Sequence, residues 1–202
     1  MFRNLTYILL AAAALVAGVM LYQLSATHAE PKLALVYPQP RALADFSLTD
    51  QHGERVNRER LYGQWTLAFV GYTYCPDICP LTLAKLAGVQ PDLAAMVQQP
   101  LKVWFISVDP KRDTAELLKA YMANFGSDFV ALRPTPEQLT KVTKDFKIYY
   151  KKVEGKTPTS YTMDHSAGSF TFDPQGRIRL YNRHASGAEA LAADVKILLS
   201  GK

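Results

Sequence analysis

The sequence predicts an α/β fold with a mixed β-sheet and helices on both faces. Two runs of apolar, β-forming residues, WTLAFVGY (65–72) and LKVWFISV (101–108), are typical of buried central strands. Each run is followed by a segment in which apolar residues recur at helical spacing. A right-handed β-α-β crossover would therefore place the two strands parallel in one sheet, with the intervening helix on one face.

The segments on either side of the first strand carry their own signals. Residues 45–56, DFSLTDQHGERV, alternate short apolar positions around a turn at 50–53 and predict a hairpin. The first helix is expected over 79–97, where Pro91 marks a kink or a break.

The second half of the chain continues the alternation of helices and strands. The stretch DTAELLKAYMANFG (113–126) predicts a helix that Asp113 caps and Gly126 ends. The remaining elements are expected as a strand over 128–133, a helix over 136–146, a strand over 147–153, a hairpin over 166–183 that turns at 173–176, and a helix over 187–200. This order matches a thioredoxin-like architecture with an added N-terminal hairpin.

The first 24 residues differ in character from the rest. Residues 5–24 contain no charge and are almost wholly apolar, and a helix of this length would span about 30 Å, the thickness of a bilayer's hydrocarbon core. We expect one transmembrane helix, a membrane anchor over 1–24, with Arg3 on the cytoplasmic side. A cleaved signal peptide ending at Ala29 is the alternative, and in both cases the domain works outside the cytoplasm.

The chain after the anchor is expected to form a linker over 25–42, which holds three prolines, and one domain over 43–202. Only two cysteines are present among 202 residues, which excludes a disulfide-stapled mini-protein and a four-cysteine zinc module. The net charge of +5 is not gathered beside stacking aromatics, so no nucleic-acid partner is expected.

Both cysteines fall in one motif, GYTYCPDICP, directly after the first central strand. The carboxyl ends of parallel strands are where α/β folds place their functional sites. A helix N-terminus beside Cys75 and Cys79 would stabilise thiolates and lower the pKa of both groups. Two such thiolates are both a soft-metal ligand pair and a redox couple.

A third donor is expected from His165, in the segment YTMDHS between two predicted strands. An imidazole beside two thiolates suits copper in either oxidation state, and zinc by ligand type alone. Because His165 would lie on a separate loop, it could leave a metal without unfolding the helix that carries the sulfurs. We therefore expect the stretch 151–166 to be mobile in the metal-free protein.

Each candidate also has a purely structural interpretation. Cys75 and Cys79 could form an inert buried pair or a structural disulfide, and His165 alone could be an ordinary loop histidine. Asp109, at the end of the second central strand, could be a turn residue or an accessory carboxylate near the site. Met163 could fill a gap in the core, or share a face with His165 and donate its thioether.

Three motifs together carry a resemblance to a known family. YTYCPDICP, FISVDPKRDT around Asp109, and YTMDHSAGSFTFDPQGR around His165 resemble the Sco (SenC/PrrC) family of copper-handling, thioredoxin-like proteins over residues 43–200. The resemblance implies that copper, as Cu(I) or Cu(II), is bound by Cys75, Cys79 and His165, with Asp109 near the metal.

The same resemblance implies a function. Sco proteins are membrane-tethered chaperones that help to assemble the CuA centre of cytochrome c oxidase. The expected partners are the oxidase subunit that bears this centre and another copper chaperone or a thiol reductant. The expected place is the inner (cytoplasmic) membrane, with the domain on the periplasmic side. The alternative is a thiol–disulfide oxidoreductase that uses Cys75 and Cys79 as a redox pair to reduce the cysteines of the oxidase copper site.

Overall fold

The computed structural model describes residues 7, 12–18, 20, 34–157, 160–166, 168–183 and 193–198. The chain divides into two units, of which the larger spans Pro31–Ser200. The predicted membrane span over 5–24 falls mostly outside the described residues, and those of it that are described are helical. Among the described residues, no helix combines the length and the apolar character that a membrane crossing needs.

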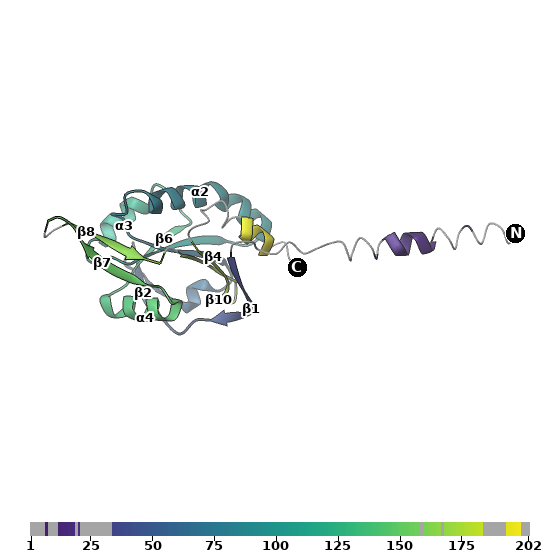
Figure 1. Cartoon of the computed structure of the whole chain (residues 1–202), viewed down its shortest axis with the longest axis horizontal. Helices are drawn as coiled ribbons and strands as arrows, with labels where there is room; N and C mark the ends of the chain where they lie inside the picture. The colour runs from purple at the N-terminus through teal and green to yellow at the C-terminus, as the bar shows by residue number, and fades with distance from the viewer. Residues whose placement is uncertain are drawn as a thin grey trace. The chain divides into compact units, whose positions relative to one another are not determined.

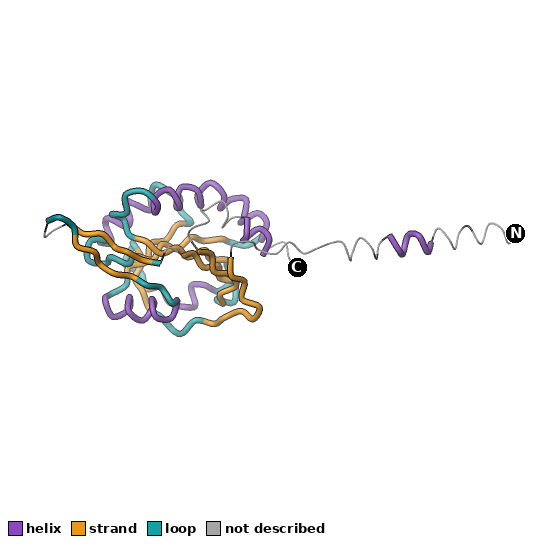
Figure 2. The backbone as a smooth tube through the Cα atoms, viewed as in Figure 1, coloured by secondary structure: helices purple, strands orange, loops and turns teal. Residues whose placement is uncertain are grey.

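An eight-stranded mixed sheet forms the centre of the larger unit (Figures 1 and 2). The strands lie in the order β1-β10-β9-β4-β5-β6-β2-β3, and β4, β5 and β6 run parallel while every other neighbouring pair is antiparallel. The strands are β1 (Ala34–Ala42), β2 (Ser47–Asp50), β3 (Arg55–Asn57), β4 (Trp65–Gly71), β5 (Leu101–Ser107), β6 (Phe129–Arg133), β9 (Gly168–Phe172) and β10 (Arg177–Arg183). The predicted parallel pairing of the two central strands is confirmed.

Helices cover both faces of this sheet, as predicted. In Figure 1, α2 (Ile78–Val97) and α3 (Ala115–Met122) lie above the sheet and α4 (Pro136–Phe146) lies below it. A short 3-10 helix, η1 (Arg58–Leu61), follows β3, and residues 193–198 are helical. The rest of the helix predicted over 187–200 lies outside the described residues.

A second, two-stranded sheet stands apart from the first. It consists of β7 (Tyr150–Glu154) and β8 (Tyr161–His165), paired antiparallel so that Tyr150 lies opposite His165. The sequence predicted a strand close to β7 but left β8 as a polar stretch between strands. Its inward and outward residues alternate along only five positions, which is too short a pattern to separate from a loop.

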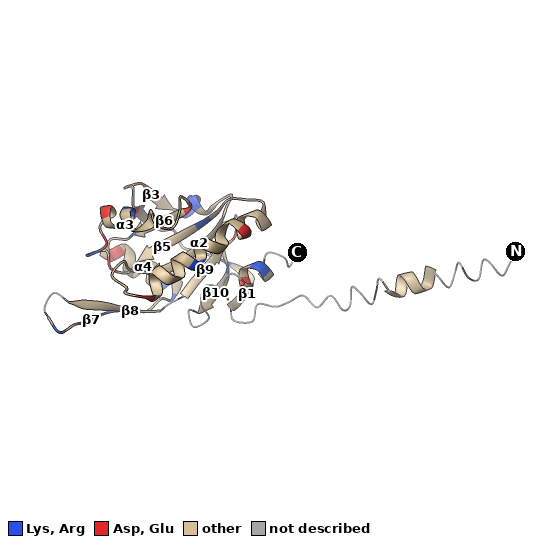
Figure 3. Ribbon diagram, turned by 90° about the horizontal axis from the view of Figure 1, so that it is seen from above, with Lys and Arg blue, Asp and Glu red and all other residues tan. Residues whose placement is uncertain are grey.

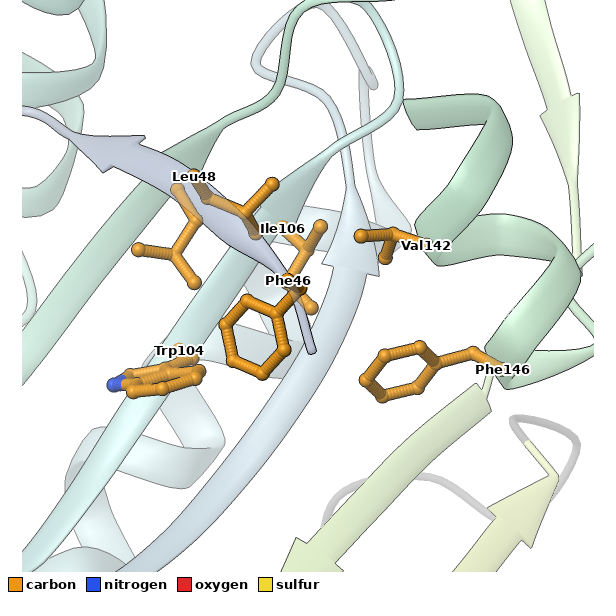
Figure 4. Close-up of a pocket in the computed structure, with 7 residues that line it drawn as sticks. Phe46, Leu48, Trp104, Ile106, Val142 and Phe146 are labelled. Carbon is orange, nitrogen blue, oxygen red and sulfur yellow. The ribbon is translucent and has the colours of Figure 1, made fainter. Parts of the chain in front are cut away.

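The core lies on the two faces of β4 and β5. Phe69, Phe105, Phe170 and Phe172 are among its largest fully buried side chains. Below the sheet, Phe46 packs edge to face on Trp104 with ring centroids 6.3 Å apart. The side chains around them leave a cavity of about 10 Å³ with apolar walls, room for no more than one water molecule (Figure 4). This cavity is a packing gap and not a ligand site.

The predicted linker over 25–42 is wrong for residues 34–42, because these residues form strand β1 at the edge of the sheet. The register of β1 on β10 shifts between Val36 and Arg41, and Pro38 and Pro40 fall inside that irregularity. Proline cannot donate a hydrogen bond to a neighbouring strand, and it is tolerated at edges and bulges for that reason. The prolines indicated a linker, whereas they mark the irregular part of an edge strand.

Details of two helices also differ from the prediction. The helix α2 runs through Pro91 without a break, and its buried residues Leu83, Leu86 and Leu93 lie on both sides of the proline, so packing holds the two parts in one helix. Thr114, not Asp113, caps α3: its side chain accepts a hydrogen bond from the amide of Leu117. The helix ends at Met122, before Gly126.

Candidate functional site

The two cysteines lie where the carboxyl end of β4 leads into α2, as predicted. Cys75 is in the connecting segment, where its amide donates to the carbonyl of Tyr72 over 3.2 Å, and Cys79 is in the first turn of α2. Cys75 is 9% exposed and Cys79 is fully buried. Both thiols are free, and their side chains are hydrogen-bonded to each other. The structure therefore brings the two sulfurs together in reduced form.

The environment of Cys79 is set by packing rather than by the helix end. Burial raises the pKa of the Cys79 thiol well above its ordinary value, and the hydrogen bond with Cys75 raises it further. The predicted lowering of this pKa by the helix N-terminus is wrong, because removing the sulfur from water disfavours the thiolate more than the helix dipole favours it. Cys79 is a protonated thiol at neutral pH.

The absence of a side chain at Gly71 leaves room for the sulfur of Cys79. A β-carbon at position 71 would lie 2.9 Å from the Cys79 sulfur and 2.8 Å from a ring carbon of Phe105. Both distances are shorter than any ordinary contact of a β-carbon, so only glycine fits without a shift of its neighbours. The last residue of β4 thus determines how closely the buried sulfur approaches the sheet.

His165 lies at the end of β8 and not on an irregular loop, which corrects that part of the prediction. The ring is half-buried, and its Nδ1 lies 3.3 Å from the carbonyl oxygen of Ser166. Burial lowers the pKa of His165, while the Ser166 carbonyl and Asp164 act in the opposite direction. The imidazole is therefore neutral at pH 7, the form that can bind a metal ion.

Tyr72 connects His165 to the cysteine segment. Its ring meets that of His165 edge to face, with centroids 6.0 Å apart. Burial raises the pKa of Tyr72, a hydrogen bond between its side chain and the backbone of Met163 opposes that shift, and the nearby Cys75 and Cys79 add to it. Within the described part of the chain, however, no three His, Cys, Asp or Glu side chains are gathered closely enough to hold a metal ion. The two thiols lie in contact with each other. His165 contacts Tyr72 in the cysteine segment, but it does not form a three-residue metal site with the thiols.

Asp109 is buried at the end of β5, and both of its carboxylate oxygens have partners. One oxygen is paired with Nε of Arg112, and the other accepts a hydrogen bond of 3.0 Å from the hydroxyl of Tyr161. A carboxylate engaged in this way is not a free ligand. Met163 packs against the core from the same face of β8 as His165, which matches its structural interpretation.

Four residues near the site were not predicted to belong to it: Tyr72, Arg112, Asp113, which was expected only as a helix cap, and Tyr161. Asp113 is buried, and it accepts hydrogen bonds from the amide and hydroxyl of Thr73 and from the hydroxyl of Ser107. Burial raises the pKa of Asp113, and these donors oppose that shift. The charged run DPKRDT was the available signal, but it reads equally well as a helix start.

Comparisons with known proteins agree on one family. The family model described as SCO1/SenC matches residues 37–200. A SCO2-like protein of Rickettsia prowazekii is 39% identical over 140 residues, 69% of this chain, and the chain spans only 66% of that protein's length. The crystal structure of Arabidopsis thaliana ScoI with copper bound is 31% identical, with a TM-score of 0.71 over 77% of this chain and 97% of that one. A structure of BsSco, described as having a disulfide switch and as a member of the Sco family of cytochrome c oxidase assembly proteins, is 26% identical, with a TM-score of 0.61 over 83% of this chain and 99% of that one.

Proposed function

Because the chain belongs to the SCO1/SenC family, we propose that it binds copper and delivers it to the CuA centre of cytochrome c oxidase. The mixed sheet with helices on both faces is the thioredoxin-like fold of its Sco neighbours. One observation carries the proposal: two free, mutually hydrogen-bonded thiols lie at the carboxyl end of a parallel strand, beside a segment that contacts a neutral histidine.

The donor set fits copper as a cargo. Cys75 and Cys79 would supply soft sulfur ligands, and His165 an imidazole nitrogen, which together suit Cu(I) and Cu(II). Two sulfurs and one nitrogen leave room for an incoming ligand, so copper can pass to a partner's thiolates in steps. The coordination would not be complete in the arrangement described above, and His165 would join the sulfurs through a shift of the hairpin β7–β8.

Because Cys79 is protonated in the metal-free protein, copper binding would be coupled to the release of its proton. When copper binds, the S–H bond of Cys79 breaks, an S–Cu bond forms and the proton leaves to solvent. When copper moves to the partner, the buried thiolate regains a proton. Because burial favours the thiol form, it opposes copper retention and assists release.

A membrane-tethered position suits this role. We propose that residues 1–24 anchor the chain in the inner (cytoplasmic) membrane and that the domain faces the periplasm. This position would bring Cys75 and Cys79 to the side of the membrane where the CuA centre is assembled. The partner would be the oxidase subunit that bears this centre, with a second copper chaperone or a thiol reductant acting before it.

A second function is favoured by the same pair of free thiols. A thiol–disulfide oxidoreductase would use Cys75 to attack a disulfide of the oxidase copper site and Cys79 to resolve the mixed disulfide. Two electrons and two protons would pass to the partner, and a Cys75–Cys79 disulfide would remain for an external thiol reductant to reduce. This function would not need His165.

A copper titration of the reduced protein separates the two functions. The proposal predicts one Cu(I) per chain, and weaker binding in His165→Ala with no change in the midpoint potential of the Cys75/Cys79 couple. His52→Ala is the matched control, because His52 lies in the β2–β3 turn. If wild-type protein does not bind copper, or if His165→Ala binds it as tightly as wild type, the copper-delivery proposal fails and the reductase remains.

A further inference from the structure

The hairpin β7–β8 is a separate element whose attachment to the domain matters for His165. Its two strands make no ladder with the eight-stranded sheet. In both Figure 1 and Figure 3 the hairpin projects from the body of the domain. A two-stranded hairpin is marginally stable by itself in water, so side-chain contacts must hold it in place.

Arg112, which follows β5, makes polar contact with the start of β8. Its Nη1 donates a hydrogen bond of 2.9 Å to the carbonyl oxygen of Tyr161, the first residue of β8. Its guanidinium carbon lies 3.5 Å from the centre of the Tyr161 ring. Tyr161 in turn donates its hydroxyl to Asp109, which is paired with Arg112. The three residues thus form a closed ring of contacts, named here the hairpin latch.

The ion pair in the hairpin latch is well shielded from water. The side chain of Asp109 is 4% exposed and that of Arg112 is 18% exposed. Removing one member of such a pair leaves the other charge buried without compensation, so the latch holds as a unit. A lysine could not replace Arg112, because only the flat guanidinium stacks on the ring while donating to two different oxygens.

The same loop also holds the cysteine segment. Asp113, next to Arg112, accepts hydrogen bonds from the amide and hydroxyl of Thr73. The guanidinium of Arg112 also lies 4.6 Å from the centre of the Tyr74 ring. The loop 109–113 therefore contacts the residues directly before Cys75 and the first residue of the strand that ends at His165.

One feature of Arg112 argues for a role beyond stability. Its Nη2 is buried and has no hydrogen-bond partner in the described part of the chain. A buried donor without an acceptor destabilises a fold, so the side chain is not placed to maximise hydrogen bonding. Its position instead satisfies two elements at once, the cysteine segment and β8.

We propose that Arg112 is a positioning residue that sets the approach of His165 to the two thiols. The latch fixes the Tyr161 end of β8 on the domain, and it thereby sets where the strand presents His165 at its other end, beside Tyr72. The inference rests on the proposed copper function, since His165 is the ligand that Arg112 would position. Asp109 acts through Arg112 and Tyr161, and not as a metal ligand.

Hydrogen exchange on the metal-free protein tests the latch without copper. Arg112→Gln and Tyr161→Phe should each raise the exchange rate of the β7 and β8 amides by about tenfold or more, because each removes a hydrogen bond to a charged group, while β4 and β5 amides stay unchanged. Lys152→Gln is the matched control, because Lys152 lies 4.4 Å from the same ring but belongs to the hairpin itself. Tyr161→Phe keeps the Asp109–Arg112 pair, so this variant still tests the latch if Arg112→Gln does not fold. Unchanged hairpin exchange in the variants that fold would overturn the proposal.

A double-mutant cycle then tests action through His165. Arg112→Gln should weaken Cu(I) binding by about 10- to 100-fold, the usual effect of losing a residue that orients a metal ligand. Arg112→Lys should not restore it. In the His165→Ala background, Arg112→Gln should cause no further loss of Cu(I) affinity, because the ligand that Arg112 positions is absent. If Arg112→Gln weakens Cu(I) binding equally in the presence and in the absence of His165, the proposal is contradicted. If the wild-type protein binds no copper, the proposed copper function is rejected, and the hydrogen-exchange result is unaffected.

Discussion

The rings of Tyr72 and His165 meet edge to face, with their centroids 6.0 Å apart and their planes at 88°. Tyr72 follows the last residue of β4 and accepts a hydrogen bond at its carbonyl from the amide of Cys75. His165 ends β8, in a separate sheet. This contact therefore joins the segment that carries the thiols to the strand that carries the imidazole, and it places the three donors in one region of the fold.

The buried thiol of Cys79 predicts how the stability of the metal-free protein depends on pH. Burial raises the pKa of Cys79 above the ordinary thiol value of about 8.5, so the folded protein holds this proton more tightly than the unfolded chain. The stabilisation is fully present below about pH 8.5 and is lost as pH rises towards the folded-state pKa. We expect the free energy of unfolding to fall between about pH 8.5 and 10, by up to about 1.4 kcal/mol per pH unit from this group.

Urea unfolding at several pH values checks this expectation, with Cys79→Ser as the control. Serine is close in size to cysteine and does not titrate in this range. The fall in stability should be less steep in Cys79→Ser than in wild type. Identical slopes in the two proteins would contradict the assignment of a raised pKa to Cys79.

Gly71 predicts a local packing effect on the thiol site. Gly71→Ala would place a β-carbon against the Cys79 sulfur and the ring of Phe105, and overpacking of this kind destabilises a protein by about 1–3 kcal/mol. Gly88→Ala is the matched control, because a β-carbon there meets nothing within 4 Å and the residue lies inside α2. That control should stabilise the protein by up to about 1 kcal/mol, since alanine favours helix. Thermal unfolding measures both, and equal effects of the two substitutions would count against the role of Gly71.

Asp113 predicts a coupling between the loop after β5 and the cysteine segment. Asp113→Ala would leave the amide and hydroxyl of Thr73 and the hydroxyl of Ser107 without their acceptor. We expect a loss of about 2–4 kcal/mol in the free energy of unfolding, because buried donors would lose their partners. Asp92→Ala, at an exposed position of α2, should change it by less than about 0.5 kcal/mol. If Asp113→Ala lowers the free energy of unfolding as little as Asp92→Ala does, Asp113 does not hold the cysteine segment in place.

Much of the fold could be predicted from the sequence because its strongest signals are local. The strands β4 and β5 are continuous apolar runs, and α4 begins at Pro136 after the capping residue Thr135, so pattern and structure coincide. The strand β1 could not be predicted, because its prolines indicate a linker unless the pairing with β10 is known. The short strand β8 likewise depends on its partner β7.

The sequence singles out the candidate donors of the site but not the residues that hold these donors in place. Cys75, Cys79 and His165 stand out because few residue types bind soft metals. Arg112 and Asp113 do not stand out, because a charged run after a strand is typical of a solvated helix start. Their roles arise from contacts with Tyr161 and Thr73, which lie far from them in the sequence. The raised pKa of Cys79 also depends on burial that no local pattern encodes.

X-ray absorption spectroscopy of the Cu(I)-loaded protein tests whether two sulfurs and one imidazole meet on one copper ion. We expect copper to be coordinated by two sulfurs and one nitrogen, with the imidazole signature lost in His165→Ala and retained in His52→Ala. A shell of two sulfurs alone in wild type, or a nitrogen ligand that persists without His165, would contradict it.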